Sequence, residues 1–240
     1  MQNCAIFQIH IPKVDKISLI DYRDKLKFLD INISHFKKNN PDCYIILCGH
    51  GIEPNTNILN KVDYVYWENK LRKIDEFGFV SNMPAQYFFV FKGLEHATKK
   101  GFDYCLKTRG DCLILRKDII NQSLQILKEE NKKLLITQNT TISGCRLGDC
   151  FMYGEIDILN SIWSNKLKNI SQDGEINCGL KFLMHFMEID SKSIELKNSL
   201  SDYDDYWMKM ITKNCSFRDV FWIGYIDMRR ELYSRGLYYY

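Results

Sequence analysis

The 240-residue sequence lacks several features that mark whole classes of protein. The uncharged stretch that includes Gly78–Phe91 is shorter than a bilayer crossing and contains polar residues, so we expect no transmembrane helix. The first ten residues lack a basic region followed by a cleavable apolar region, so we expect no secretory signal. The net charge of +3 is small and arises from interspersed residues, which disfavours nucleic acid as a partner.

Cysteine and glycine motifs with known chemistry are also missing. The nine cysteines contain no C-x-x-C pair of the kind that a structural zinc site uses. Several lie in apolar runs, as Cys48 does, and we expect reduced thiols in a cytoplasmic protein. No G-x-x-x-x-G-K-[ST], no G-x-G-x-x-G after the first strand and no G-x-S-x-G occurs. Their absence disfavours P-loop, dinucleotide-binding and α/β-hydrolase chemistry.

What is present is an alternation of short apolar runs with amphipathic segments. Runs rich in β-branched and aromatic residues predict strands over 4–11, 43–47, 62–67, 102–109, 134–137 and 151–153. Apolar residues spaced by three and four predict helices over 18–38, 84–99, 117–132, 157–165 and 174–187. Residues 53–60 and 190–205 are polar and predict loops. This order predicts a single α/β domain over 1–240, with a mainly parallel sheet flanked by helices.

In an open parallel sheet, ligands bind beyond the carboxyl ends of the strands. The polar residues that follow the predicted strands are His10, Lys13, His50, Glu68, Lys107, Arg109 and Asp111. Asp149 precedes a later strand, and Asp173 and Glu175 stand at the start of a later helix. Such a mixture can hold a phosphorylated ligand, with or without a divalent cation. Acidic residues at a helix start also stabilise the helix dipole, so a structural interpretation stays open.

A set of motifs resembles a known family in order and spacing. The motifs span roughly residues 80–190 and are Asn82–Gln86, Gly93–Ala97, Leu106–Asp111, Gly148–Gly154 with Trp163 behind it, and Glu175. They are similar to those of the bacterial WavE-like glycosyltransferases of lipopolysaccharide and capsule biosynthesis, which are of the GT-A type.

The resemblance implies a GT-A-like fold, with a Rossmann-like nucleotide-binding half at about residues 1–115 and an acceptor-side half at 116–240. It implies transfer of a sugar from a nucleotide-sugar donor to a cell-surface glycan or lipid-linked glycan of lipopolysaccharide, lipooligosaccharide or capsule. The donor-binding candidates are His10 and Lys13 after the first predicted strand, together with Gln86, Lys107, Arg109 and Asp111 of the motifs. It implies Glu175 as the catalytic base, with Asp173 and Asp149 as the other candidates.

The metal requirement is open at this stage. GT-A enzymes usually carry Asp-x-Asp at this turn, whereas this sequence has Arg109, Gly110 and Asp111. Asp111 alone can support Mn²⁺ or Mg²⁺, because Mg²⁺ often takes only one or two protein carboxylates beside phosphates and waters. Alternatively, Arg109 contacts the diphosphate directly through its planar fork.

Two other functions fit the same residues. A nucleotidyl- or phospho-group transferase on a similar fold would use the same acidic and basic groups. A non-catalytic nucleotide- or glycan-binding module would use the acidic residues as helix caps. The C-terminal segment from Trp222 mixes aromatic residues with arginines. It is either a peripheral contact with the inner face of the cytoplasmic membrane or a packing element of the domain.

Overall fold

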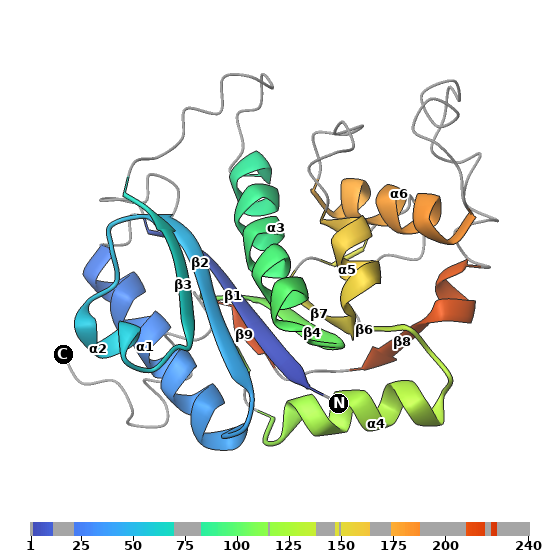
Figure 1. Ribbon diagram of the computed structural model, residues 1–240, viewed down its shortest axis with the longest axis horizontal. Coiled ribbons are helices and arrows are strands. Elements are labelled where there is room, and N and C mark those ends of the chain that lie inside the picture. The colour runs from blue at the N-terminus through green and yellow to red at the C-terminus, as the bar shows by residue number, and fades with distance from the viewer. Residues whose placement is uncertain are drawn as a thin grey trace.

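The computed structural model describes residues 2–11, 22–69, 83–114, 116–137, 147–148, 150–163, 174–187, 210–218 and 222–224. The strands of the main sheet are β1 (Asn3–Ile11), β2 (Tyr44–Gly51), β3 (Tyr64–Glu68), β4 (Tyr104–Arg109), β6 (Leu134–Thr137), β7 (Phe151–Glu155) and β8 (Cys215–Arg218). They lie in the order β3-β2-β1-β4-β7-β6-β8 (Figure 1). A separate antiparallel pair joins β5 (Cys112–Ile114) to β9 (Trp222–Gly224).

The main sheet is mixed, and most of its neighbouring strands are parallel. β1 pairs in parallel with β2 and β4, and β2 pairs in parallel with β3. β7 runs antiparallel to both β4 and β6, whereas β6 and β8 are parallel. The predicted α/β domain with a mainly parallel sheet is therefore confirmed, with one strand reversed.

The helices cover both faces of this sheet. They are α1 (Tyr22–Asn39), α2 (Thr56–Leu59), α3 (Met83–Lys100), α4 (Ile119–Glu129), α5 (Ile156–Ile162) and α6 (Gly174–Met187). The short helix α2 lies in a segment predicted to be a loop. Its start is capped by the Asn55 side chain, which accepts a hydrogen bond of 3.1 Å from the backbone N–H of Ile58. The strands β5, β8 and β9 were not predicted from the sequence.

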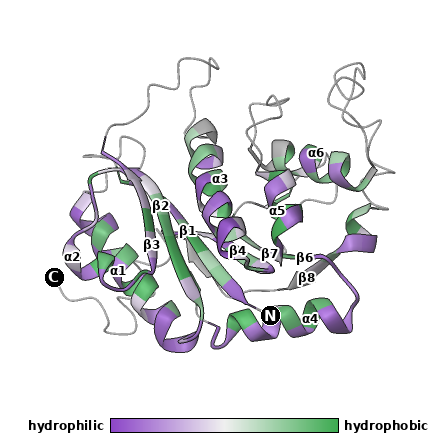
Figure 2. Cartoon of the chain, in the orientation of Figure 1, coloured by the Kyte–Doolittle hydropathy of each residue, from purple (hydrophilic) through white to green (hydrophobic). Residues whose placement is uncertain are grey.

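Two apolar layers make up the core, one on each side of the sheet. Cys4 and Ile6 of β1 pack in the layer with α3, α5 and α6, whereas Phe7 and Ile9 pack in the layer with α1 and α4. This follows from the alternation of side chains along a strand. Figure 2 shows β1 and β2 as largely hydrophobic, as expected for strands covered on both faces.

Helix α3 runs antiparallel to the strands that it covers. Phe89 stacks on His50 near the end of β2, whereas His96 stacks on Tyr64 at the start of β3. The first turn of α3 therefore lies at the carboxyl edge of the sheet. α5 and α6 lie beside α3 on the same side (Figure 1).

Two sequence predictions about the environment of the chain can be compared with this fold. Within the described ranges, no helix combines the length and the apolar character that a bilayer crossing needs. The described cysteines are all free thiols. The backbone of residues 222–224 pairs with β5, and a membrane role for the C-terminal segment stays a prediction.

Candidate functional site

The turn that follows β4 carries a close ion pair. Arg109 donates from Nε to Oδ1 of Asp111 at 2.9 Å and from Nη2 to Oδ2 at 2.8 Å. Both carboxylate oxygens of Asp111 thus accept from the same guanidinium, in the bidentate geometry that suits these two groups. The Arg109 side chain is 39% exposed and that of Asp111 is 20% exposed, so the guanidinium can be reached from solvent.

The backbone of this turn is fixed by a buried side chain of α1. Asn32 is 0% exposed, and its Nδ2 donates to the carbonyl of Gly110 at 3.1 Å and to that of Cys112 at 2.8 Å. The N–H of Gly110 donates to the carbonyl of Gln8 on β1 at 2.8 Å. A Cβ at Gly110 would lie 2.9 Å from atoms of Ile9 and Leu29, so only glycine fits here without a shift. Hydrogen bonds and close packing with β1 and α1 therefore fix the backbone of the turn.

Positive charge surrounds the carboxylate of Asp111. Its burial alone would raise the pKa of Asp111, but the charge and hydrogen bonds of Arg109, together with the charge of Lys25, lower that pKa below its usual value. Lys25 comes from the start of α1, and its Nζ lies 3.5 Å from the carbonyl oxygen of His10. Asp111 is therefore ionised at neutral pH, and two cations flank it.

A column of stacked rings lies beside the turn, across the ends of β1 and β2. The rings of His10 and His50 are 4.3 Å apart at an angle of 9°, and the His50 ring lies 4.9 Å from that of Phe89. His50 is buried, and within the described part of the chain neither of its ring nitrogens has a hydrogen-bond partner. Burial and the neighbouring His10 lower the pKa of His50 to about 4, against a smaller opposing effect of Glu68. His50 is therefore neutral at pH 7.

The carboxyl edge thus gathers four of the residues predicted to bind a donor. His10 ends the ring column on β1, and Arg109 and Asp111 occupy the turn after β4. Gln86 is half-buried in the first turn of α3, which lies at the same edge. The arrangement offers a cationic fork, aromatic faces and an amide, which are groups that contact phosphates and bases.

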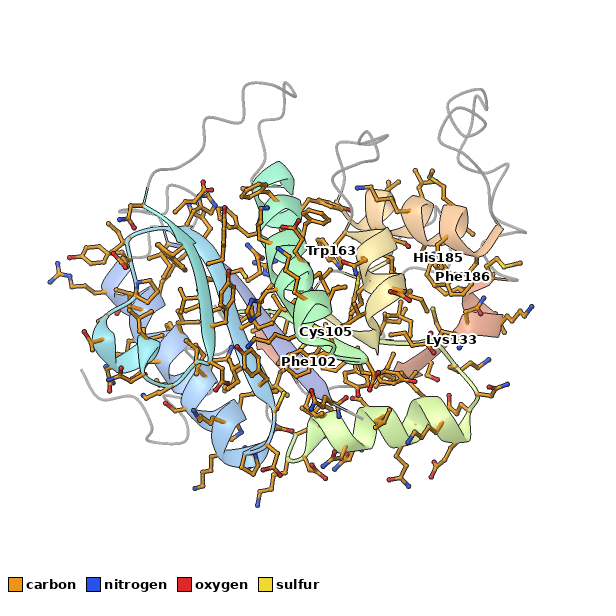
Figure 3. The ribbon with its side chains drawn as sticks, in the orientation of Figure 1. Phe102, Cys105, Lys133, Trp163, His185 and Phe186 are labelled. Atoms are coloured by element: carbon orange, nitrogen blue, oxygen red, sulfur yellow. The ribbon has the colours of Figure 1, made fainter. Side chains whose placement is uncertain are left out.

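Lys107, predicted to supply charge beside Arg109, lies in the interior. It is 0% exposed, and its Nζ lies 4.3 Å from the ring centroid of Trp163, which Figure 3 labels at the end of α5. Lys181 of α6 is also buried, with its Nζ 4.0 Å from the ring centroid of Tyr87, and burial lowers its pKa to about 8. These two lysines belong to the layer between the sheet and its covering helices, and Lys107 does not reach the turn.

The remaining predicted site residues are not placed in the same way. Lys13, predicted to bind the donor, and the catalytic candidates Asp149 and Asp173 lie outside the described residues. Glu175 is the second residue of α6, and the structure describes its backbone but not its side chain. The assignment of a catalytic base therefore stays a prediction.

A divalent cation on Asp111 would compete with Arg109 for the carboxylate oxygens. Both oxygens of Asp111 are engaged by Arg109, and Lys25 adds a second nearby positive charge. Among the described residues, no group of three or more histidine, cysteine, aspartate or glutamate side chains is suited to a metal. In this arrangement the turn does not fit Mn²⁺ or Mg²⁺, which need free carboxylate oxygens.

Sequence reasoning missed Asn32 and Lys25. Asn32 carried a usable signal, because it lies between Leu29 and Ile33 of the apolar face predicted for the helix over 18–38. A buried polar side chain needs a partner, and here the partners are the two carbonyls of the turn. Lys25 carried no comparable signal, because it is one of many lysines in the sequence.

Comparisons with known proteins inform the fold. No known protein family and no curated protein matches the sequence. Among solved structures, a candidate glucose-1-phosphate thymidylyltransferase from Bacillus anthracis is similar with a TM-score of 0.52 and 8% identity, covering 99% of this chain and 97% of that one. A candidate nucleotide-diphospho-sugar transferase from Desulfovibrio desulfuricans G20 has a TM-score of 0.47 and 9% identity, covering 90% and 100%.

The galactosyltransferase LgtC, solved with donor and acceptor sugar analogues, has a TM-score of 0.42 and 12% identity, covering 76% of this chain and 70% of that one. At such identities, similarity concerns the arrangement of the elements alone, and the two lower scores add no argument. The chain therefore shares the α/β fold of the Bacillus anthracis protein.

Proposed function

We propose that this protein is a glycosyltransferase that moves a sugar from a nucleoside diphosphate sugar to a cell-surface glycan of lipopolysaccharide, lipooligosaccharide or capsule. The observation that carries the proposal is the partly exposed side chain of Arg109, which is paired with Asp111 at the carboxyl end of β4. That edge is where open α/β sheets bind their ligands. The motif resemblance over residues 80–190 supports sugar transfer as the reaction.

The chemistry of sugar transfer suits these groups. As the bond from the sugar to the diphosphate breaks, negative charge grows on the departing diphosphate. Fixed cations aimed at that charge stabilise the transition state more than the ground state. Because Nε and Nη2 of Arg109 donate to Asp111, the guanidinium would contact the diphosphate oxygens along its other edge, through Nη1 and the second N–H of Nη2, and Lys25 would add a longer-range attraction. Of the stacked rings, His10 is partly exposed and His50 is buried, so a nucleoside attached to that diphosphate would have to contact the ring of His10.

The acceptor hydroxyl must lose a proton as it attacks the sugar. We assign this role to Glu175, at the start of α6, on the strength of the motif resemblance. The variant Glu175→Gln keeps the size and hydrogen-bonding capacity of the side chain but removes the base. Its turnover is expected to fall by about two orders of magnitude or more, while its thermal midpoint and nucleotide affinity stay unchanged. Turnover near that of the wild type would remove Glu175 from this role.

Nucleotidyl transfer is the second candidate, because the similar Bacillus anthracis structure is described as a thymidylyltransferase. The two reactions release different products. A glycosyltransferase releases a nucleoside diphosphate from a nucleoside diphosphate sugar, whereas a nucleotidyltransferase releases pyrophosphate from a nucleoside triphosphate and a sugar phosphate. Separate assays for nucleoside diphosphate and for pyrophosphate therefore distinguish them.

The experiment is a screen of UDP-, GDP- and dTDP-sugars against oligosaccharide acceptors. We expect one donor class to be consumed with release of its nucleotide, and we expect Arg109→Ala to reduce that release. Lys133→Ala is the matched control, because Lys133 pairs with Glu155 at 2.8 Å near the opposite edge of the sheet. Saturable nucleotide binding without any turnover would favour a binding module. Pyrophosphate release in a parallel assay with nucleoside triphosphates and sugar phosphates would favour the nucleotidyltransferase.

A further inference from the structure

We propose that the Arg109–Asp111 pair binds the donor diphosphate without a divalent metal ion, so that the guanidinium takes the place that a metal would fill. This inference rests on the proposed function, because it specifies how the same site holds its donor. Asp111 is then a positioning residue that aims the guanidinium, and Arg109 is the residue that touches the diphosphate.

The hydrogen bonds of the pair disfavour a metal on the same carboxylate. A cation on Asp111 would have to share its two oxygens with the N–H groups that Arg109 donates to them, or displace those groups. It would also be repelled by the positive charges of Arg109 and Lys25, both of which act on Asp111. Like charges at such a site oppose each other most strongly where solvent is partly excluded, and Asp111 is 20% exposed. The site therefore favours an anion over a second cation.

The turn also holds the pair in place before any ligand arrives. Asn32 anchors the backbone on both sides of Asp111, and the space around Gly110 admits no side chain. A fork whose orientation is fixed in advance loses less conformational entropy when it binds. With 39% of its side chain exposed, Arg109 remains accessible from the carboxyl edge.

The test measures the affinity of the full chain for UDP, GDP, CDP and dTDP by titration calorimetry. Each titration is run in EDTA, in Mg²⁺ and in Mn²⁺. We expect the diphosphate that binds best to have the same affinity in all three conditions, to within about twofold. When Mg²⁺ or Mn²⁺ is titrated without nucleotide, we expect no binding heat that depends on Asp111.

Two substitutions distinguish the hydrogen bonds of the Arg109 guanidinium from its positive charge. Arg109→Ala is expected to weaken diphosphate binding by about ten- to a hundredfold, the usual size of one charge-assisted contact. Arg109→Lys keeps the charge and serves as a second variant where alanine disturbs the turn, with an intermediate loss expected. Binding of the corresponding nucleoside without phosphates is expected to stay unchanged in both variants, which a general loss of structure would not allow. Lys133→Ala again serves as the control.

The variant Arg109→Asp is expected to make diphosphate binding depend on a metal ion. It removes the guanidinium and places a second carboxylate two residues from Asp111, which is a pair of ligands that Mg²⁺ and Mn²⁺ accept. We expect this variant to lose diphosphate binding in EDTA and to regain part of it in Mn²⁺. The wild type is expected to show no such dependence.

The outcomes separate the inference from the function on which it rests. Wild-type binding that appears only with Mg²⁺ or Mn²⁺ overturns metal-free recognition and leaves the glycosyltransferase proposal standing. Equal binding by wild type and Arg109→Ala overturns the role of the fork. Binding of none of the four diphosphates in any condition overturns the proposed function and the inference together.

Discussion

Replacing Asn32 by alanine tests whether the turn after β4 is built as described. Asn32 is fully buried and donates to the carbonyls of Gly110 and Cys112, so Asn32→Ala removes two hydrogen bonds from the interior. Losing each bond costs about 1 kcal/mol where water replaces the donor and about 2 kcal/mol where the carbonyl stays buried without one. We therefore expect the free energy of unfolding to fall by about 2–4 kcal/mol.

Urea denaturation measures this change, with the slope of the transition showing whether unfolding still exposes the same surface. Asn39→Ala is the matched control, because Asn39 lies on the same helix and makes one local hydrogen bond, to the carbonyl of His35 at 2.9 Å. Its expected loss is about 1 kcal/mol or less. A loss in Asn32→Ala no larger than that of the control would refute the anchoring of the turn. Diphosphate binding should also weaken in Asn32→Ala and not in Asn39→Ala.

Three further predictions follow from the same edge of the sheet and from the core. Burial and His10 lower the pKa of His50 to about 4, so between pH 6.5 and 4 the unfolded chain binds a proton on this residue more readily than the folded chain does. The free energy of unfolding should therefore fall by up to about 3 kcal/mol as the pH drops through this window. In thermal unfolding measured over this pH range, His50→Phe should show a weaker dependence of stability on pH. Gly110→Ala should cost about 1–3 kcal/mol in urea denaturation, because its Cβ would crowd Ile9 and Leu29. Burial raises the pKa of Cys48, so iodoacetamide should label this thiol only after unfolding, as mass spectrometry would show.

Much of the fold could be predicted because its signals are local. The apolar runs that became β1 and β2 are buried on both faces, and such runs stand out in a sequence. The reversed direction of β7 left no local trace, because it depends on pairing with β4 across more than forty residues. The strands β5 and β9 are each three residues long and exist through their pairing with each other. Strands of that length fall below what periodicity can detect.

In the candidate site, too, the local features could be predicted and those that depend on distant contacts could not. Arg109 and Asp111 are two residues apart, so their proximity could be read from the sequence. That both oxygens of Asp111 face Arg109 depends on the shape of a turn held by Asn32, far away in the chain. Lys107 is buried, with its Nζ 4.3 Å from the ring centroid of Trp163, more than fifty residues later, and this burial could not be predicted from the local sequence. Residue type and spacing predicted the edge of the sheet, but they could not distinguish a strand-end lysine from a buried one.

The central claim, that Arg109 binds a donor diphosphate at the end of β4, is tested most directly by calorimetric titration of UDP, GDP, CDP and dTDP in EDTA. The account predicts saturable binding of one of them to the wild type and to Lys133→Ala, with a loss of about tenfold or more in Arg109→Ala. Indistinguishable affinities in the wild type and Arg109→Ala, or no binding to the wild type with or without Mn²⁺, would contradict it.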